Sequence, residues 1–293
     1  MNRDSNSRHL TLLSLFEGGN PFWSSEYLRY GSAELLERIA SGEYADRKKS
    51  GKSLQETLIE IDPNQFLSQL DSIGAFVISR DDPDWPTSLD DLGAPPIALI
   101  GRGVRSALSS FQESISIVGT RNPTEYGVRV AGDFAAGAVD RGWSVISGGA
   151  FGIDSAAHRG ALLAEGKTIA ILGGGVNSIF PSGNERLFRE IMESGLLLSE
   201  VLPNVHAIPA RFLIRNRLIA ALSRATVVVE AAFRSGSLRT ARDASEIFRP
   251  VFAVPGPIHA PTSDGCHRLI GERTAEIVTS VADLMELVGP LTL

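Results

Sequence analysis

Arginine is concentrated in one stretch of the chain, and its spacing there predicts contacts with phosphate. Residues 205–245 contain seven arginines and two acidic residues, so this stretch carries a net charge of +5. At its centre, Arg215 and Arg217 flank Asn216; guanidinium groups bind phosphate through paired hydrogen bonds, and asparagine both donates and accepts. Phe212 offers a face on which a base can stack. The stretch is typical of a nucleic-acid site, with a solvated helix start and a core phenylalanine as the alternatives.

Three glycine-rich segments each follow an apolar, β-branched run. They are 119–123 (GTRNP), 147–154 (SGGAFGID) and 173–175 (GGG). Glycine lets backbone N–H groups approach a ligand closely, and a following helix N-terminus adds partial positive charge. Each segment therefore predicts a phosphate cradle, and a tight strand-to-helix turn is the alternative.

A few residues have the types needed for acid–base catalysis. Asp154 and His158 are four residues apart at an expected helix start, so they share a face and can form an acid/base couple. The alternative is that Asp154 caps the helix and His158 bonds a neighbouring segment. Glu200 and Glu230 end two expected strands, where they can do acid–base work or orient nearby arginines. Ser235 and Ser237 fit a helix N-terminus better than a nucleophile.

Signatures of common cofactors are missing from the sequence. No G-x-G-x-x-G follows the first expected strand, which argues against a dinucleotide. Residues 160–168 (GALLAEGKT) have five residues between the glycines instead of four and precede a strand, so we interpret them as a helix end with a glycine cap. The single cysteine, Cys266, with its neighbour His267, makes one ligand pair at most, and no H-E-x-x-H is present. We expect no cofactor and no metal.

The elements that must position these residues alternate between strands and helix-length segments. Near-continuous apolar runs indicate parallel strands that are buried on both faces. Such alternation predicts a doubly wound α/β sheet with right-handed crossovers, whose ligands bind beyond the carboxyl ends of the strands. The expected strands are 115–119, 144–147, 168–172, 196–199, 225–230 and 251–254.

The N-terminal part of the chain has a different pattern of apolar residues. Residues 1–72 show short helical periodicities, which predict a small helical domain. Strands are expected at 73–79 and 98–101, with a loop at 81–86 and a linker at 103–111. The expected organisation is a helical N-terminal domain (1–72) and an extended Rossmann-like, mostly parallel domain (73–293, core 112–288).

Bulk composition limits the class of protein. The chain has 293 residues, of which 43% are hydrophobic, and a net charge of −6. Residues 1–105 hold 16 acidic and 11 basic side chains, so most of the negative excess lies there and the basic stretch stands apart from it. There is no apolar run of about 18 residues and no signal-peptide pattern, so we expect a cytoplasmic protein without membrane contact.

Taken together, the motifs resemble the DNA-processing protein A (DprA/Smf) family over roughly residues 73–288. A D-x-x-W-P-x-x-L pattern within 83–96 resembles the segment leading into that family's Rossmann-like domain. The ordered blocks are 119–121 (GTR), 147–154 with 157–158 (AH), 181–184 (PS and N), 215–220 (RNRLIA), 229–231 (VEA), 235–241 (SGSL and TA) and 251–256 (VFAVPG). The sequence departs from the family at Cys266-His267 and at 271–274, and it leaves no room for the winged-helix domain that many members carry at the C-terminus.

The resemblance implies a single-stranded DNA groove, a homodimer, a RecA-type recombinase partner, a role in natural transformation or recombination, and no catalytic activity. The predicted nucleic-acid-binding residues are Arg121, Ser147, Gly148, Gly149, Gly152, Phe212, Arg215, Asn216, Arg217, Ser235, Gly236 and Arg239. Two other classes remain open. One is a nucleotide or phosphoribosyl hydrolase that uses Glu200, Glu230 or Asp154, and the other is a sensor that binds a small nucleotide without turnover.

Overall fold

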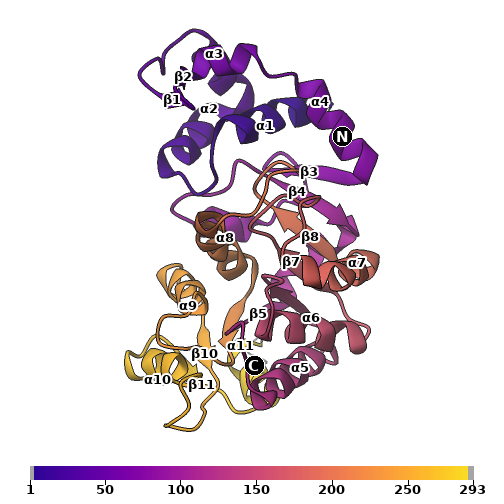
Figure 1. Cartoon of the computed structure of the whole chain (residues 1–293), viewed down its shortest axis with the longest axis vertical. Coiled ribbons are helices and arrows are strands. Elements are labelled where there is room, and N and C mark those ends of the chain that lie inside the picture. Colours follow the sequence, from indigo (N-terminus) through magenta and orange to yellow (C-terminus); the bar gives the residue numbers. More distant parts are fainter. Residues whose placement is uncertain (1–2, 290–293) are drawn as a thin grey trace.

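A nine-stranded sheet runs through the computed structural model of the chain, which describes residues 3–289 (Figure 1). Its strand order is β11-β10-β9-β5-β6-β7-β8-β4-β3, parallel from β11 to β8 and antiparallel for β4 and β3. The predicted α/β fold with a doubly wound, mostly parallel sheet and a helical N-terminal region is confirmed. The strands are β3 (Ala75–Ser79), β4 (Ala98–Gly103), β5 (Ser114–Val118), β6 (Ser144–Ser147), β7 (Thr168–Ile171), β8 (Leu196–Ser199), β9 (Ala225–Val228), β10 (Val251–Ala253) and β11 (Glu276–Ile277).

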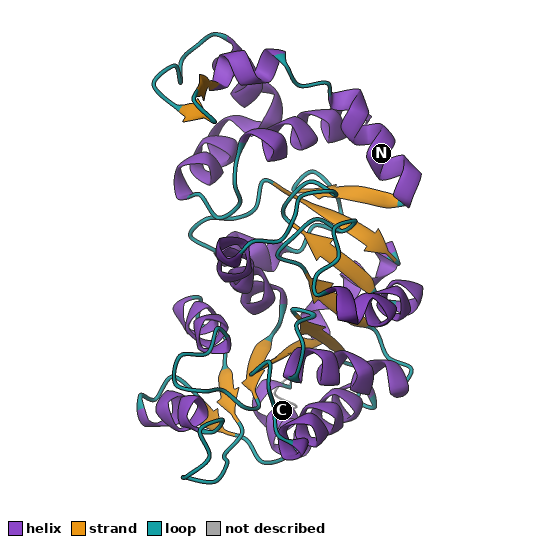
Figure 2. Cartoon of the chain, viewed as in Figure 1, coloured by secondary structure: helices purple, strands orange, loops and turns teal. Residues whose placement is uncertain are grey.

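Helices cover both faces of the sheet (Figure 2). One buried cluster joins α8, α9 and α10 to the sheet, and a second joins α5, α6 and α11 to its other face. The sheet-covering helices are α5 (Glu125–Val139), α6 (Ile153–Leu163), α7 (Glu185–Ser194), α8 (Pro209–Leu222), α9 (Ser237–Glu246), α10 (Asp264–Gly271) and α11 (Val281–Val288). The strands between these layers are therefore buried on both sides, as their apolar runs predict.

The N-terminal helices lie beyond the β3 edge of the sheet (Figure 1). They are α1 (Arg3–Leu15), α2 (Pro21–Ala40), α3 (Leu54–Ile59) and α4 (Pro63–Ile73), with a small hairpin of β1 (Lys48–Lys49) and β2 (Lys52–Ser53) between α2 and α3. Leu10 and Leu13 of α1 and Leu67 and Leu70 of α4 share a buried cluster with Val77 of β3. This apolar contact fixes the helices against the sheet. The boundary between the two predicted domains, after residue 72, stays a prediction. Residues 1–2 of the first predicted domain and 290–293 of the second lie outside the described residues.

Several local predictions were wrong. The expected linker at 103–111 is largely a 3-10 helix, η2 (Arg105–Glu113), and the turn at Thr87–Asp91 forms a second one, η1. Helix α8 begins at Pro209, where proline at the first helical position needs no hydrogen-bond partner for its nitrogen, so Arg215, Asn216 and Arg217 lie within the helix. The two-residue strand β11 was missed because its residues are exposed and carry no apolar pattern.

Candidate nucleic-acid interface

The groove that contains most of the predicted chemistry lies where the chain reverses direction across the sheet. β5 and β9 are neighbours, but the chain leaves β5 toward β6 and leaves β9 toward β10 on the other side. Such a switch point opens a crevice at the carboxyl ends of the strands. A cavity of about 370 Å³ occupies it, between the segments after β5 and β9 and the helix α8. We call this cavity the switch-point groove.

Half of the predicted binding residues meet in the switch-point groove. The members that line it are Arg121, Phe212, Arg215, Asn216, Ser235 and Gly236. They come from three segments that are far apart in the sequence: the loop after β5, the helix α8 and the turn before α9. The topology of the sheet therefore brings them together.

Phe212 is the aromatic centre of the groove. Its ring packs against Gly173, where a Cβ would lie 2.8 Å from the ring, so the glycine leaves room for it. The guanidinium carbons of Arg121 and Arg215 lie 5.5 and 5.9 Å from the ring centroid. Two cations beside one partly buried ring form a surface that can stack a base and hold the adjacent phosphate.

Arg215 is buried although it carries a charge. Its Nη1 donates to the carbonyl of Ile171 at 2.8 Å, and its guanidinium lies against Gly148, where a Cβ would come within 1.8 Å of Nη1. Burial lowers the pKa of Arg215 to about 10, so the side chain stays charged at neutral pH. Burial has the opposite effect on the acid Asp154: it raises the pKa of the carboxyl, and the charge of the nearby Arg215 opposes that rise. Arg215 and Asp154 are thus buried groups of opposite charge that interact in the wall of the groove.

The turn at residues 235–237 closes the opposite side of the groove. The side-chain amide of Asn216 donates to the carbonyl of Gly236 at 3.2 Å, and the hydroxyls of Ser235 and Ser237 are 2.7 Å apart. Helix α9 starts at Ser237, so the prediction that these serines begin a helix is confirmed. The bond from Asn216 holds this turn in place against α8.

The remaining predicted glycines and Ser147 support the groove from behind. Ser147 is fully buried and donates to the carbonyl of Ile117 at 2.6 Å. Gly149 has a φ of +68° and packs on Phe188, and Gly152 has a φ of +84° and contacts the backbone of Thr120. The prediction that Asp154 caps α6 was wrong, because Gly152 occupies the cap position. Whether any of these residues contacts a ligand stays a prediction.

Two predicted arginines are held by acidic partners. Arg217 bonds both oxygens of Glu200 at 2.6 Å, and both side chains are largely buried. Arg239 pairs with Asp243 at 2.6 Å on the surface of α9. Neither side chain lines the switch-point groove. Their guanidinium groups are therefore already neutralised, and their role toward nucleic acid stays a prediction.

The acidic residues that suggested catalysis have structural partners. Glu230 accepts hydrogen bonds from the backbone N–H and the hydroxyl of Thr124, which precedes α5, at 2.9 and 2.7 Å. Glu200 is paired with Arg217, and burial raises its pKa. Neither carboxylate lines the groove, whereas Asp154 does. The acid–base use of Glu200 and Glu230 would thus require these bonds to break.

His158 has no access to the groove either. Its ring is fully buried. The hydroxyl of Thr168 donates to the carbonyl of Val145, so the same hydroxyl oxygen accepts a hydrogen bond from Nδ1–H of His158 at 2.7 Å. Burial, aided by the charge of Arg215, lowers the pKa of His158 to about 3. The histidine is therefore a neutral core residue that ties α6 to β7.

This burial predicts a pH-dependent stability. In the folded protein the pKa of His158 lies below its ordinary value of 6.5. The contribution of the neutral ring to the free energy of unfolding is therefore complete above pH 6.5 and is lost as the pH falls toward 3. The loss amounts to about 1.4 kcal/mol per pH unit. Urea unfolding of wild type and His158→Gln at several pH values between 5 and 7.5 should show a shallower pH slope for the variant. The exposed His259→Gln serves as the control, and equal slopes in all three proteins would contradict the prediction.

Two further cationic or aromatic side chains at or beside the groove were not in the predicted set. Arg234 lines the groove with an exposed guanidinium, and it could have been found because it lies in the arginine-rich stretch beside the Ser235-Gly236 turn. Phe180 is 52% exposed and its ring centroid lies 5.6 Å from that of Phe212. No sequence signal marked Phe180, because it reaches Phe212 only through the fold of the loop after β7.

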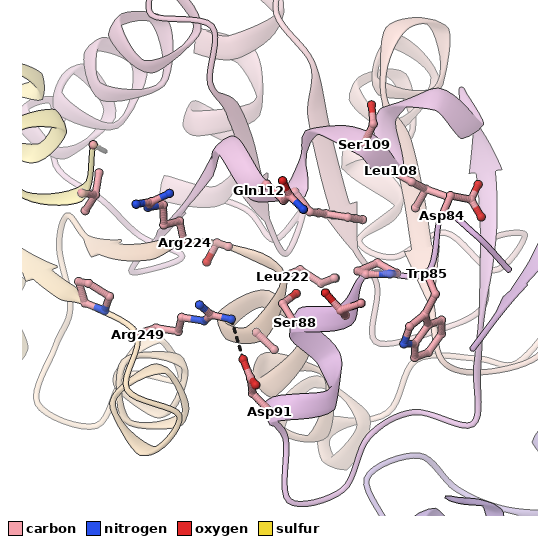
Figure 3. Close-up of a pocket in the computed structure, with 18 of the residues that line it drawn as sticks. Asp84, Trp85, Ser88, Asp91, Leu108, Ser109, Gln112, Leu222, Arg224 and Arg249 are labelled. Atoms are coloured by element: carbon pink, nitrogen blue, oxygen red, sulfur yellow. Dashed lines mark hydrogen bonds and ion pairs between the residues drawn. The ribbon is translucent and has the colours of Figure 1, made fainter. Parts of the chain in front are cut away.

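A larger cavity, of about 1440 Å³, lies at the amino ends of the strands (Figure 3). Its walls include Trp85, Gln112, Arg224 and Arg249, and Arg249 is paired with Asp91 at 2.7 Å. None of the predicted binding residues lines it. The size of this cavity therefore does not make it a better candidate than the smaller groove, where the cations and the aromatic ring converge.

The positions that depart from the family pattern have structural contacts. Cys266 is fully buried, with its sulfur 3.6 and 3.7 Å from the carbonyl oxygens of Val228 and Val229, and burial raises the pKa of its thiol to about 12. His267 Nε2 lies 3.0 Å from the carbonyl of Gly256. Within residues 3–289, no group of three or more potential ligands is placed to hold a metal ion, and no helix is long and apolar enough to cross a membrane.

Comparison with known proteins gives a consistent result. The sequence profile described as DNA recombination-mediator protein A matches residues 76–289. The DNA processing protein DprA of Streptococcus pneumoniae is 35% identical over 260 residues, which cover 88% of this chain and 90% of that protein.

Solved structures agree with the sequence comparison. The crystal structure of DprA from Streptococcus pneumoniae superposes with a TM-score of 0.74 and 32% identity, covering 92% of this chain and 98% of that one. A structure that describes the single-stranded DNA binding mode of DprA from Helicobacter pylori superposes with a TM-score of 0.66 and 30% identity, covering 73% and 94% of the two chains.

Proposed function

Because the chain belongs to the DNA recombination-mediator protein A (DprA/Smf) family, we propose that it binds single-stranded DNA in the switch-point groove. The observation that carries the proposal is the arrangement around Phe212, with the guanidinium groups of Arg121 and Arg215 within 6 Å of its ring. A base stacks on the ring while the adjacent phosphate meets Arg121, the exposed one of the two cations. The single-stranded DNA binding mode described for DprA from Helicobacter pylori supports this choice of ligand.

The wider role that we propose is that of a non-catalytic mediator. The protein holds single strands, protects them and helps to load a RecA-type recombinase during recombination or DNA uptake. We further propose that it acts in the cytoplasm as a homodimer. The family name supports the recombination role, and the structural bonds of Glu200 and Glu230 support binding over hydrolysis.

Replacing Arg121 should weaken binding most directly among the exposed residues. The side chain is exposed, so Arg121→Ala leaves no buried group without a partner. Loss of one phosphate contact should lower affinity for single strands about tenfold and reduce the slope of log K against log salt by about 0.7. Fluorescence anisotropy of labelled oligo-dT at several salt concentrations measures both quantities.

The control is Arg186→Ala, which removes an arginine of α7 that is 89% exposed and does not line the groove. It should bind as wild type does. A length series from one to about 35 nucleotides separates the alternatives, because a strand groove gains affinity over several nucleotides whereas a small-ligand pocket saturates at one. Absence of binding to any oligonucleotide, or equal effects of the two substitutions, would overturn the proposed function.

A further inference from the structure

The hairpin β1–β2 carries a compact positive charge in an otherwise acidic part of the chain. Residues 47–52 contain four basic side chains and no acidic one, whereas residues 1–105 as a whole are acidic. Lys49 pairs with Lys52 across a two-residue turn, in which Ser50 and Gly51 have φ values of 52° and 85°. Two positive φ values are typical of the tight hairpin turns that match the twist of their strands. The basic segment thus has a defined backbone conformation.

Side-chain contacts fix the hairpin on the helices beneath it. The guanidinium carbon of Arg47 lies 3.8 Å from the ring centroid of Phe22. Lys49 Nζ donates to the carbonyl of Ser14 near the end of α1. Ser53 and Glu56 form reciprocal capping bonds at the start of α3. Lys48 is exposed, and Lys52 is exposed with Glu60 as its ion-pair partner.

One ion pair joins the loop after α1, which lies beside the hairpin, to helix α8. Glu17, in the loop after α1, bonds the guanidinium of Arg211 through both oxygens at 2.5 and 3.0 Å. The bond from Arg211, together with a smaller effect of the Lys49 charge, lowers the pKa of the Glu17 carboxyl. Arg211 precedes Phe212 on α8. Lys49 of the hairpin lies near both Glu17 and Arg211, so the hairpin stands beside the helix that carries Phe212.

The loop after α1 packs closely against Glu200 and helix α8. A Cβ on Gly18 would lie 2.3 Å from the carboxyl of Glu200, and a Cβ on Gly19 would lie 2.8 Å from Ile214. Close approach of the backbone at these two positions requires glycine. The relative position of the hairpin and α8 is thus set by packing as well as by the ion pair.

We propose that the hairpin β1–β2 binds phosphates of the same single strand after it leaves the switch-point groove. This inference rests on the proposed function and extends it to the N-terminal helical region. Residues 1–105 carry a net negative charge, which repels a strand, and the exposed ammonium groups of Lys48 and Lys52 offer it cations there instead. The sequence of the strand does not matter for such contacts, because phosphate carries no base information.

The test compares oligo-dT of about 6 nucleotides, which fills the groove, with oligo-dT of about 25 nucleotides, which reaches beyond it. The variant is Lys48→Ala/Lys52→Ala, in which both side chains are exposed. Arg186→Ala/Arg189→Ala on α7 is the matched control, because it also removes two exposed, positively charged groups. Fluorescence anisotropy at low and moderate salt gives affinity and salt slope.

The hairpin variant should bind the long oligonucleotide about tenfold more weakly than wild type, with a smaller salt slope. It should bind the short one as wild type does, and the control should be unchanged with both. Equal affinity of wild type and the hairpin variant for the long oligonucleotide, while the short one still binds, would overturn this inference alone. Failure of wild type to bind the short oligonucleotide would instead overturn the proposed function.

Discussion

Arg215→Ala is expected to destabilise the protein by about 3 kcal/mol, because it removes one partner of a buried pair of charges. The substitution leaves the carboxylate of Asp154 buried without its compensating cation, and it abolishes the bond from Arg215 to the carbonyl of Ile171. For a chain of this size the melting temperature should fall by about 5 to 10 °C. Urea unfolding and thermal melting both measure the effect.

The stability lost in Arg215→Ala should be smaller at low pH than at high pH. Without Arg215 the pKa of Asp154, already raised by burial, rises further, so the carboxyl can take up a proton when the pH is lowered. Protonation removes the unpaired charge, and the variant should therefore lose less stability at pH 5.5 than at pH 8.

A double substitution separates this explanation from simple loss of packing. In Asp154→Asn/Arg215→Met both of these buried charges are removed together, so part of the lost stability should return. Arg215→Ala with wild-type stability at pH 8 would contradict the buried-pair interpretation. In that case weakened DNA binding by this variant would have to reflect a lost ligand contact alone.

The strands and the position of the groove could be predicted from the sequence. Apolar runs that end in glycine or polar residues predicted strand ends within two residues of those observed for β5 to β10. A strand that is buried on both faces consists almost entirely of apolar residues, so its limits are visible in the sequence. Since ligands bind at the carboxyl ends of such strands, Arg121 was expected in the crevice. The resemblance to the family implied the turn at 235–236 there as well, and both line the groove.

The burial of Arg215 could not be predicted in the same way. Arginine is normally exposed, so a charge pattern assigns it to the surface. The space for its guanidinium exists because Gly148 lacks a side chain and Asp154 supplies a countercharge, and both belong to segments far from α8 in sequence. Only the three-dimensional fold brings these groups together.

The ion pairs of Glu17 and Glu200 illustrate the same limit. Counting charges makes residues 205–245 strongly basic, but Arg211 and Arg217 are paired with acidic residues from outside that window. The cations free to meet a ligand are consequently fewer than the sequence suggests. Among the residues that the structure describes, Arg121 and Arg234 line the groove with exposed guanidinium groups.

Gly152→Ala should damage the groove without touching a charged side chain. Gly152 has a φ of +84° and a ψ of −126°, which an L-residue adopts only with strain. An added Cβ would lie 2.3 Å from the carbonyl oxygen of Thr120 and 2.8 Å from the backbone of Arg121. Because backbone atoms are the obstacle, the 120–121 segment must move, at a cost of about 3 kcal/mol.

Movement of this segment should displace Arg121 from Phe212, so Gly152→Ala should bind oligo-dT about as weakly as Arg121→Ala does. The double variant should bind no more weakly than either single one, because both substitutions remove the same contact. Gly132→Ala is the matched control: its Cβ would meet nothing within 4 Å in α5, so it should retain binding and full stability. If folded Gly152→Ala binds as wild type does, the 120–121 loop does not position Arg121 for DNA.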